Sequence, residues 1–398
     1  MRDSSRLLTM LMIPKMPHWR QICLNQPVTR KILLLSIFFP LSAGPAPACT
    51  TFLIPQSREK VMGKNYDWTH NDGMLVVNKK NLKKTALAAK PAQWVSRYGS
   101  VTFNQHGREL PLGGINEAGL AVEVMWLDDS SHPPAGQVPQ VNELQWIQYQ
   151  LDNYSSAAEL AANADKIVVA KVFAPVHYLA CDKTGECASI EYISRKLRVR
   201  VGKDLFVNTM ANDTYNSSTA FLRNFKGFGG DRDIPSGEDS LSRFVRASSL
   251  AKNYVQQNPA EEYAFGILQS VHQTDPEKAT QWSIVYSLAA GHVAFRSQGD
   301  YKLQTLAISA FDYSCSQPVK TLELNQGWSG DVSGNFIPYT RALNRKVVER
   351  GLKDTGAELP PELIDEIAAY PESAICLENP PLNLSYKVSV DESFVEGL

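Results

Sequence analysis

The sequence predicts an α+β fold in which two sheets pack together and helices cover their outer faces. Segments with the alternating pattern of strands come in antiparallel hairpin groups, and segments with helical spacing come in pairs between those groups. This order differs from the regular strand–helix alternation of a parallel sheet. The apolar share of 43% and the charged share of 20% are ordinary for a soluble globular protein, which agrees with a large core.

The first hairpin is expected directly after a long apolar segment near the start of the chain. Cys49–Ile54 and Val61–Trp68 have strand character and flank a polar turn, Pro55–Lys60. Such a hairpin brings Lys64 and Asp67 back beside Cys49. Further strands are expected at 120–127, 176–179, 188–192, 197–201, 205–207, 282–288, 293–296 and 303–310, and helices at 141–166 and 242–270.

The first 48 residues have the pattern of a secretory signal. Arg30 and Lys31 precede the apolar run 32–41, and small residues follow up to Ala46-Pro47-Ala48. We therefore expect a leader at 1–48, one main domain at 49–340 and a C-terminal helical extension at 341–398 that packs on it. The mature chain contains no apolar run of membrane-helix length, and the expected location is the periplasm or the medium.

Cys49 has unusual chemistry if the leader is cut after Ala48. It then carries both a thiol, which is a nucleophile when deprotonated, and a free α-amino group with a pKa of about 7.7–8.0. One residue thus holds a nucleophile and its base. The alternative is a lipid anchor that blocks both groups, although Ala-Pro-Ala suits ordinary signal peptidase better.

Composition narrows the remaining classes of function. The chain has 40 Lys+Arg against 41 Asp+Glu, a net charge of -1, which gives no support to nucleic-acid binding. Its histidines show no metal-ligand spacing.

Among the cysteines, Cys181 and Cys187 flank a predicted hairpin turn, so a bridge between them leaves Cys315 with Cys376. The alternative is four reduced thiols.

Several short motifs together resemble one known family. In order they are Cys49-Thr50-Thr51-Phe52, Gly63-Lys64-Asn65-Tyr66-Asp67-Trp68, Gly114–Val122, Ala211–Tyr215, Ser240–Phe244 and Thr280–Tyr286. In this order and spacing, residues 49–315 resemble the choloylglycine hydrolases, the bile salt hydrolases and penicillin V acylases among the N-terminal nucleophile hydrolases. The resemblance implies a four-layer αββα sandwich and cleavage of linear, non-peptide amides of small molecules. It implies no metal or cofactor, and an assembly of two or four copies.

The resemblance also implies roles for particular residues. Cys49 matches the nucleophile, Asp67 the aspartate that holds the α-amino group, and Arg243 a second active-site arginine. Asn212 matches the asparagine that donates to the oxyanion, with Asn208 as a nearby competitor. The chain departs from the family at Lys64, where an arginine is usual, and lysine keeps the charge but loses the planar five-donor fork.

The remaining site residues are aromatic. Trp126 occupies the second oxyanion position, where a backbone N–H can donate, and an aromatic residue there resembles the Gram-negative and penicillin-acylase branch. We expect Trp126, Trp68 and Phe52 to line the acyl pocket. The substrates that fit are conjugated bile salts, penicillin V and N-acyl homoserine lactones. A lipid-anchored or catalytically weakened ligand-binding homologue is the alternative, and Lys64 is the argument for it.

Overall fold

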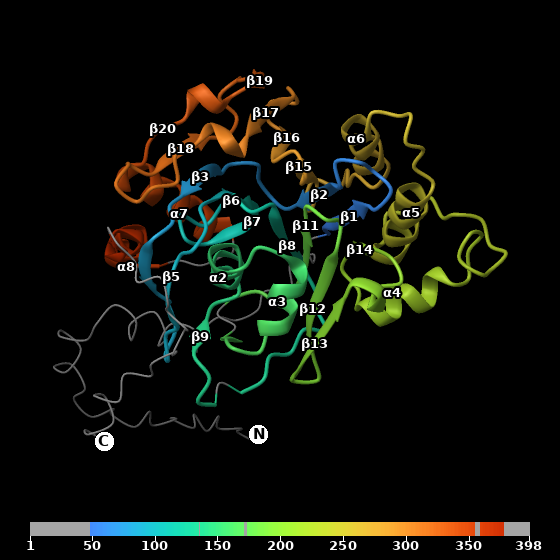
Figure 1. The fold of residues 1–398 in the computed structure, drawn as a ribbon, viewed down its shortest axis with the longest axis horizontal. Helices are drawn as coiled ribbons and strands as arrows, with labels where there is room; N and C mark the ends of the chain where they lie inside the picture. Colours follow the sequence, from blue (N-terminus) through green and yellow to red (C-terminus); the bar gives the residue numbers. More distant parts are fainter. Residues whose placement is uncertain (1–47, 135, 171–172, 355–358, 378–398) are drawn as a thin grey trace, which may run out of the picture.

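The computed structural model describes residues 48–134, 136–170, 173–354 and 359–377. The predicted leader up to residue 47 and the end of the predicted C-terminal extension lie outside these residues. Within them, two large sheets form the centre of the molecule, and helices cover both outer faces (Figure 1). The fold is the expected α+β sandwich of four layers. No helix in the described ranges is long and apolar enough to cross a membrane.

One sheet has seven strands and carries the first hairpin. In spatial order the strands are β14 (Thr209–Met210), β1 (Thr50–Ile54), β2 (Val61–Asp67), β15 (Thr280–Ser287), β16 (His292–Ser297), β17 (Gln304–Ala307) and β19 (Gly330–Asp331). All neighbours are antiparallel except β17 and β19. The β1–β2 register puts Thr51 opposite Lys64, as the predicted hairpin requires.

The other sheet has nine strands in antiparallel pairs. They are β13 (Lys196–Val201), β12 (Cys187–Ile193), β11 (Val176–Asp182), β8 (Leu120–Trp126), β7 (Pro111–Asn116), β6 (Ser100–Asn104), β3 (Met74–Asn78), β18 (Lys320–Glu323) and β20 (Ile337–Pro338). Two smaller sheets are formed by β9 (Gln140–Val141) with β10 (Val168–Val169), and by β21 (Ile375–Cys376), β4 (Leu82–Thr85) and β5 (Gln93–Val95).

The two large sheets pack through aromatic side chains. Phe103 on β6 contacts Trp282, Tyr286 and Phe295 of the seven-stranded sheet, with ring centroids 6.2, 6.5 and 5.4 Å away. The contacts with Tyr286 and Phe295 are edge-to-face, a geometry that adds to the stabilisation that burial itself gives. The layer between the sheets is therefore apolar, and any charged group inside it needs a partner.

Helices form the two outer layers. α5 (Ser240–Lys252) and α6 (Ala260–Ser270) cover β1, β2 and β15, and α4 (Tyr215–Leu222) packs beside α5 (Figure 1). α2 (Gln145–Asn153) and α3 (Ala157–Asn163) cover the nine-stranded sheet. α7 (Arg341–Asp354) and α8 (Pro361–Ala369) follow the last strand of that sheet, and Val347 of α7 packs on Met74 and Val76 of β3.

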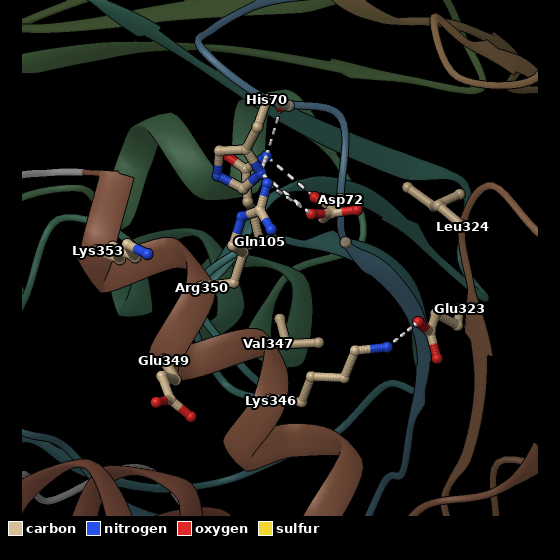
Figure 2. A pocket seen from close by; sticks show the side chains of 11 residues that line it. His70, Asp72, Gln105, Glu323, Leu324, Lys346, Val347, Glu349, Arg350 and Lys353 are labelled. Atoms are coloured by element: carbon tan, nitrogen blue, oxygen red, sulfur yellow. Dashed lines mark hydrogen bonds and ion pairs between the residues drawn. The ribbon is translucent and has the colours of Figure 1, made fainter. Parts of the chain in front are cut away.

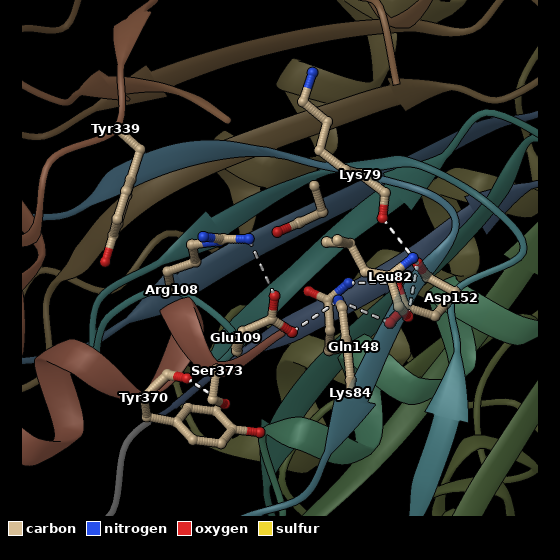
Figure 3. A network of polar contacts seen from close by, with 12 residues as sticks. Lys79, Leu82, Lys84, Arg108, Glu109, Gln148, Asp152, Tyr339, Tyr370 and Ser373 are labelled. Carbon is tan, nitrogen blue, oxygen red and sulfur yellow. Dashed lines mark hydrogen bonds and ion pairs between the residues drawn. The ribbon is translucent and has the colours of Figure 1, made fainter. Parts of the chain in front are cut away.

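The described part of the C-terminal segment is tied to the main body by polar contacts. Tyr370 donates its hydroxyl hydrogen to the Thr85 carbonyl, 2.5 Å away, and β21 pairs with β4. Beneath it lies a buried ion cluster, in which the Lys84 ammonium is 2.8 Å from Glu109 and 2.9 Å from Asp152 (Figure 3). Burial raises the pKa of Asp152 to about 6, although Lys84 opposes that shift.

One sequence prediction of local structure was wrong. The strand expected at 205–207 is irregular, and the strand falls at β14, because the chain first makes a short 3-10 helix at Gly202–Asp204. The segment at 141–166, where helices were expected, contains the pair α2 and α3. Ser156 accepts a hydrogen bond from the Glu159 N–H and starts α3 anew, as serine favours. The sequence also left strands β3 to β7 unassigned.

Candidate active site

Cys49 lies directly before β1 and is 3% exposed. Side chains alternate along a strand, so Cys49 and Leu53 face the layer between the sheets, whereas Phe52 and Ile54 face α5 and α6. Among the cysteines that the structure describes, Cys49 alone is unpaired. A free thiol thus lies at the N-terminal end of β1, next to the other predicted site residues.

The Cys49 thiol is surrounded by groups of both charges. Burial raises its pKa, and the positive charges of Lys64 and Arg243 oppose that effect, Lys64 more strongly. The backbone N–H of Asp67 donates toward the sulfur, which favours the thiolate, whereas the Asp67 carboxylate disfavours it. The β1–β2 hairpin therefore brings Lys64 and Asp67 to Cys49.

Asp67 has one satisfied and one unsatisfied carboxylate oxygen. Its Oδ1 accepts a hydrogen bond of 2.6 Å from the Thr280 hydroxyl on β15. Its Oδ2 is buried, lies 3.9 Å from Arg243 Nη1, and has no hydrogen-bond partner among the residues that the structure describes. Burial raises the pKa of Asp67 to about 7, against the lowering effects of Arg243, the Thr280 hydrogen bond and Lys64.

Arg243, in the first turn of α5, joins Cys49 to the loop that carries Asn212. Its Nη1 donates to the Cys49 carbonyl at 2.8 Å and also to the Thr50 hydroxyl, and its Nη2 donates to Asn212 Oδ1 at 2.7 Å. The side chain is 1% exposed, unlike a surface arginine on a helix. Three bonds from one rigid guanidinium hold β1 and the Asn212 loop in a defined relative position.

Asn212 and Trp126 meet across the two sheets. Asn212 Nδ2 donates to the Trp126 carbonyl at 2.9 Å, and because Arg243 fixes the Oδ1, the amide cannot flip. The N–H of Leu127, the next residue, donates to the Pro175 carbonyl on the β11 side of β8. Backbone groups of neighbouring residues in a strand point to opposite edges, so the N–H and C=O of Trp126 point away from β11, toward Asn212. The backbone carbonyl of Asn208, the competing asparagine, accepts a hydrogen bond from the Leu53 N–H.

Lys64 is fully buried and is held away from solvent by acceptors in the nine-stranded sheet. Its ammonium donates to the Val124 carbonyl and lies 3.9 Å from Glu123 Oε2. Glu123 also accepts a bond of 2.5 Å from the Tyr286 hydroxyl, and burial raises its pKa to about 7. Sequence reasoning missed Glu123, although a lone acidic residue inside an apolar strand was a usable signal.

The aromatic residues separate into two groups. Trp68 and Trp126 are both partly exposed, with ring centroids 6.4 Å apart. Phe52, which we expected in the acyl pocket, is fully buried between β1 and the outer helices and touches neither tryptophan. Strand alternation puts it on the opposite face of β1 from Cys49, so this expectation does not hold. A Cβ on Gly63 would strike its ring.

The four other described cysteines form two disulfides. Cys181 bonds to Cys187 across the β11–β12 hairpin, where the two residues are register partners, and Cys315 bonds to Cys376. These are the pairs that the sequence spacing favours. The second bond links the segment after β17 to β21, so it fastens the C-terminal segment to the main body.

A separate cavity of about 440 Å³ lies between α7 and the loop after β2 (Figure 2). Its charged walls are paired across the opening, since Lys346 lies 2.6 Å from Glu323 and Arg350 lies 3.3 Å from Asp72. Gln105, which also lines it, accepts a hydrogen bond of 2.5 Å from the Tyr66 hydroxyl. Gln105 thus links the cavity to Tyr66, whose ring stacks on Trp68.

Comparisons with known proteins identify the family of this chain. Residues 49–321 match the family described as linear amide C-N hydrolases, choloylglycine hydrolase family. The chain is 28% identical over 251 residues to penicillin V acylase of Pectobacterium atrosepticum, a match that spans 58% of this chain and 66%, just under two thirds, of that protein.

Solved structures give the same result for the fold. The structure of penicillin V acylase from Agrobacterium tumefaciens matches 73% of this chain and 98% of its own, with 26% identity and a TM-score of 0.65. A variant of conjugated bile acid hydrolase from Clostridium perfringens matches 71% of this chain and 98% of its own length, with 17% identity and a TM-score of 0.60. At this identity the similarity shows the fold alone. The chain therefore belongs to the choloylglycine hydrolase family of linear amide C–N hydrolases.

Proposed function

We propose that the chain hydrolyses a linear amide through a thioester on Cys49, after export and cleavage between Ala48 and Cys49. The observation that carries this proposal is the buried Asp67 Oδ2, which lacks a hydrogen-bond donor beside the Cys49 thiol. An orphaned buried carboxylate oxygen is costly. A free α-ammonium group on Cys49 is the donor that cleavage would supply, and its charge would favour the ionised form of Asp67.

The surrounding groups suit each step of such a cycle. The Cys49 thiolate attacks the amide carbonyl, and the oxyanion receives hydrogen bonds from the Asn212 side chain and the Trp126 N–H. The α-ammonium gives its proton to the leaving nitrogen as the C–N bond breaks, which leaves a thioester. The amine then takes a proton from water, and the hydroxide equivalent attacks the thioester carbon, which releases the acid and restores the thiolate and the α-ammonium.

The acyl group that suits the site best is aromatic. The partly exposed rings of Trp68 and Trp126 offer two aromatic surfaces beside the oxyanion groups. Aromatic groups pack on one another with ring centroids about 4.5–7 Å apart, so a phenoxyacetyl group can contact both indoles. We therefore place penicillin V ahead of conjugated bile salts and N-acyl homoserine lactones, and two penicillin V acylases are among the relatives.

One observation favours the alternative, a homologue that binds acyl amides with weak or no turnover. The Lys64 ammonium is occupied by the Val124 carbonyl and has Glu123 as a partner of opposite charge. Its effect on the Cys49 thiol is therefore partly offset. Such a protein would bind penicillin V without releasing acid, and a lipid-anchored form would carry an adduct on Cys49.

The test compares the processed enzyme with Cys49→Ser. Intact mass should show a chain that begins at Cys49 with no adduct, and amide hydrolysis should be lost in Cys49→Ser while the circular dichroism spectrum is unchanged. Turnover should be measured on penicillin V, a conjugated bile salt and an N-acyl homoserine lactone. Hydrolysis that survives in Cys49→Ser, or a mature chain that begins elsewhere, would overturn the mechanism.

A further inference from the structure

The loop that carries Asn212 is anchored from behind by a buried histidine–glutamate pair. The loop joins β14 to α4, and His177 on β11 places its Nε2 2.7 Å from the Ala211 carbonyl oxygen. The His177 Nδ1 lies 3.4 Å from Glu191 Oε1 on β12. His177 and Glu191 are 0% and 1% exposed, so water does not compete for these contacts.

Both ring nitrogens of His177 face acceptors. A carbonyl oxygen can only accept a hydrogen bond, so Nε2 must carry a proton. An ionised carboxylate is also an acceptor only, and a bare Nδ1 would turn its lone pair toward Glu191. Only the imidazolium has a proton on both nitrogens, and Glu191 supplies the opposite charge that a buried cation needs.

Glu191 also holds the other end of the same loop. Its Oε1 accepts the Tyr215 N–H at the start of α4 at 2.8 Å, and its Oε2 accepts from Arg200 Nη1 at 2.8 Å. Burial would raise the pKa of Glu191, but the contacts with His177, the Tyr215 N–H and Arg200 outweigh it and leave the pKa below its ordinary value. The pair therefore binds the loop at two points, the Ala211 carbonyl and the Tyr215 N–H.

The same part of the nine-stranded sheet also holds the side chain of Asn212, through Trp126. Val176, the neighbour of His177 in β11, is the register partner of Trp126 in β8. Trp126 accepts from the Asn212 side chain, and His177 donates to the carbonyl of Ala211. Two consecutive loop residues are thus fastened to one pair of strands, one of them through a charged group.

We propose that His177, held as an imidazolium by Glu191, is a positioning residue that sets the direction of the Asn212 amide toward the oxyanion. The proposal rests on the proposed function for its kinetic consequence and on hydrogen-bond geometry for the charge of His177. The pair itself consists of His177 from β11 and Glu191 from β12, and the other charged and titratable groups around it are Arg200 from β13 and Tyr215 from α4. His177 touches no substrate atom in this scheme.

A positioning role predicts a particular kinetic pattern. The oxyanion exists only in the transition state, so a displaced donor lowers kcat and leaves KM nearly unchanged. Removal of an oxyanion donor costs about 10²–10³ in kcat, and a shifted donor should cost less, about tenfold. His177→Gln keeps one neutral donor and His177→Leu keeps none, so kcat should fall in the order wild type, Gln, Leu.

The experiment measures kcat and KM for these two variants and for Glu191→Gln. His292→Gln is the matched control, because it removes another histidine–glutamate pair, with Glu261 at 3.0 Å, on β16 away from the loop. We expect kcat to fall about tenfold or more in His177→Leu and Glu191→Gln, with KM within about twofold, and no change in the control. Unchanged kcat in both variants, or a loss confined to KM, would refute the positioning role.

Two further measurements keep this proposal separate from the proposed function. Nitrogen-15 NMR of the wild-type protein should show both His177 nitrogens protonated at pH 7, and one bare nitrogen would refute the imidazolium even if no variant folds. The alkylation rate of Cys49 by iodoacetamide should be unchanged in His177→Gln, because displacement of iodide needs no oxyanion donor. If the wild type hydrolyses no amide, the function fails while the NMR result still decides the charge of His177.

Discussion

At the scale of single residues, the site depends on how a buried carboxylate keeps its charge. Asp67 is buried, and its pKa of about 7 is set by burial against the Arg243 charge and the Thr280 hydrogen bond. A carboxylate that must hold an α-ammonium group works only when it is ionised. The Thr280 hydroxyl stabilises that ionised form, so it extends the pH range in which Asp67 can act.

Thr280→Val tests this dependence. The substitution removes the 2.6 Å hydrogen bond to Asp67 Oδ1, so the pKa of Asp67 should rise. Because the proposed mechanism requires the ionised form, the acid limb of the kcat/KM profile should move to higher pH. Thr280→Ser keeps the hydroxyl and should leave the limb in place. A limb that moves equally in both variants, or in neither, would exclude this role for the hydroxyl.

At the scale of elements, the start of α5 links helix stability to the site. Asp239 caps the helix, since its Oδ1 accepts the Ser242 N–H at 2.9 Å, and Arg243 follows one residue later. The guanidinium reaches Cys49, Thr50 and Asn212 from this first turn. Fraying of the turn would therefore loosen three contacts of the site at once.

Asp239→Ala should lower both stability and activity. Loss of an N-cap costs about 1 kcal/mol of unfolding free energy, and kcat should fall with it because Arg243 is no longer held. Ser156→Ala is the control, since it removes the cap of α3, on the other outer layer. Urea unfolding should show similar losses for both variants, and steady-state kinetics a loss for Asp239→Ala alone. An equal fall in kcat would mean that general destabilisation is the cause.

At the scale of the whole molecule, the C-terminal segment is fastened by one long-range bond. The Cys315–Cys376 disulfide joins residues 61 positions apart, whereas Cys181–Cys187 joins residues 6 apart. A crosslink restricts the unfolded chain more when the loop it closes is longer. The long-range disulfide therefore contributes more to stability and holds β21 against β4.

Replacement of each pair by serine should show this difference. The variant that lacks Cys315 and Cys376 should lose about 4 kcal/mol of unfolding free energy, and the variant that lacks Cys181 and Cys187 should lose about 2 kcal/mol. Urea unfolding under oxidising conditions measures both. Equal losses, or a larger loss for the short-range pair, would show that loop closure does not set the contribution.

Local patterns were sufficient for part of this result. The β1–β2 hairpin, the α5–α6 pair and the approach of Lys64 and Asp67 to Cys49 follow from alternation and turn residues, which act over a few positions. The strand expected at 205–207 was wrong because a 3-10 turn decides that boundary locally. Such a turn does not change the hydrophobic period that the prediction used.

The sequence by itself determined the family, because its motifs each span a few adjacent positions. The same motifs predict Cys49 as the nucleophile and the residues that serve it. Only the tertiary structure decided that Glu123 partners Lys64, and that His177 and Glu191 hold the Asn212 loop. These contacts join strands of different sheets, or a strand to a distant loop. Their burial and hydrogen-bond partners depend on how the layers pack, which no local pattern encodes.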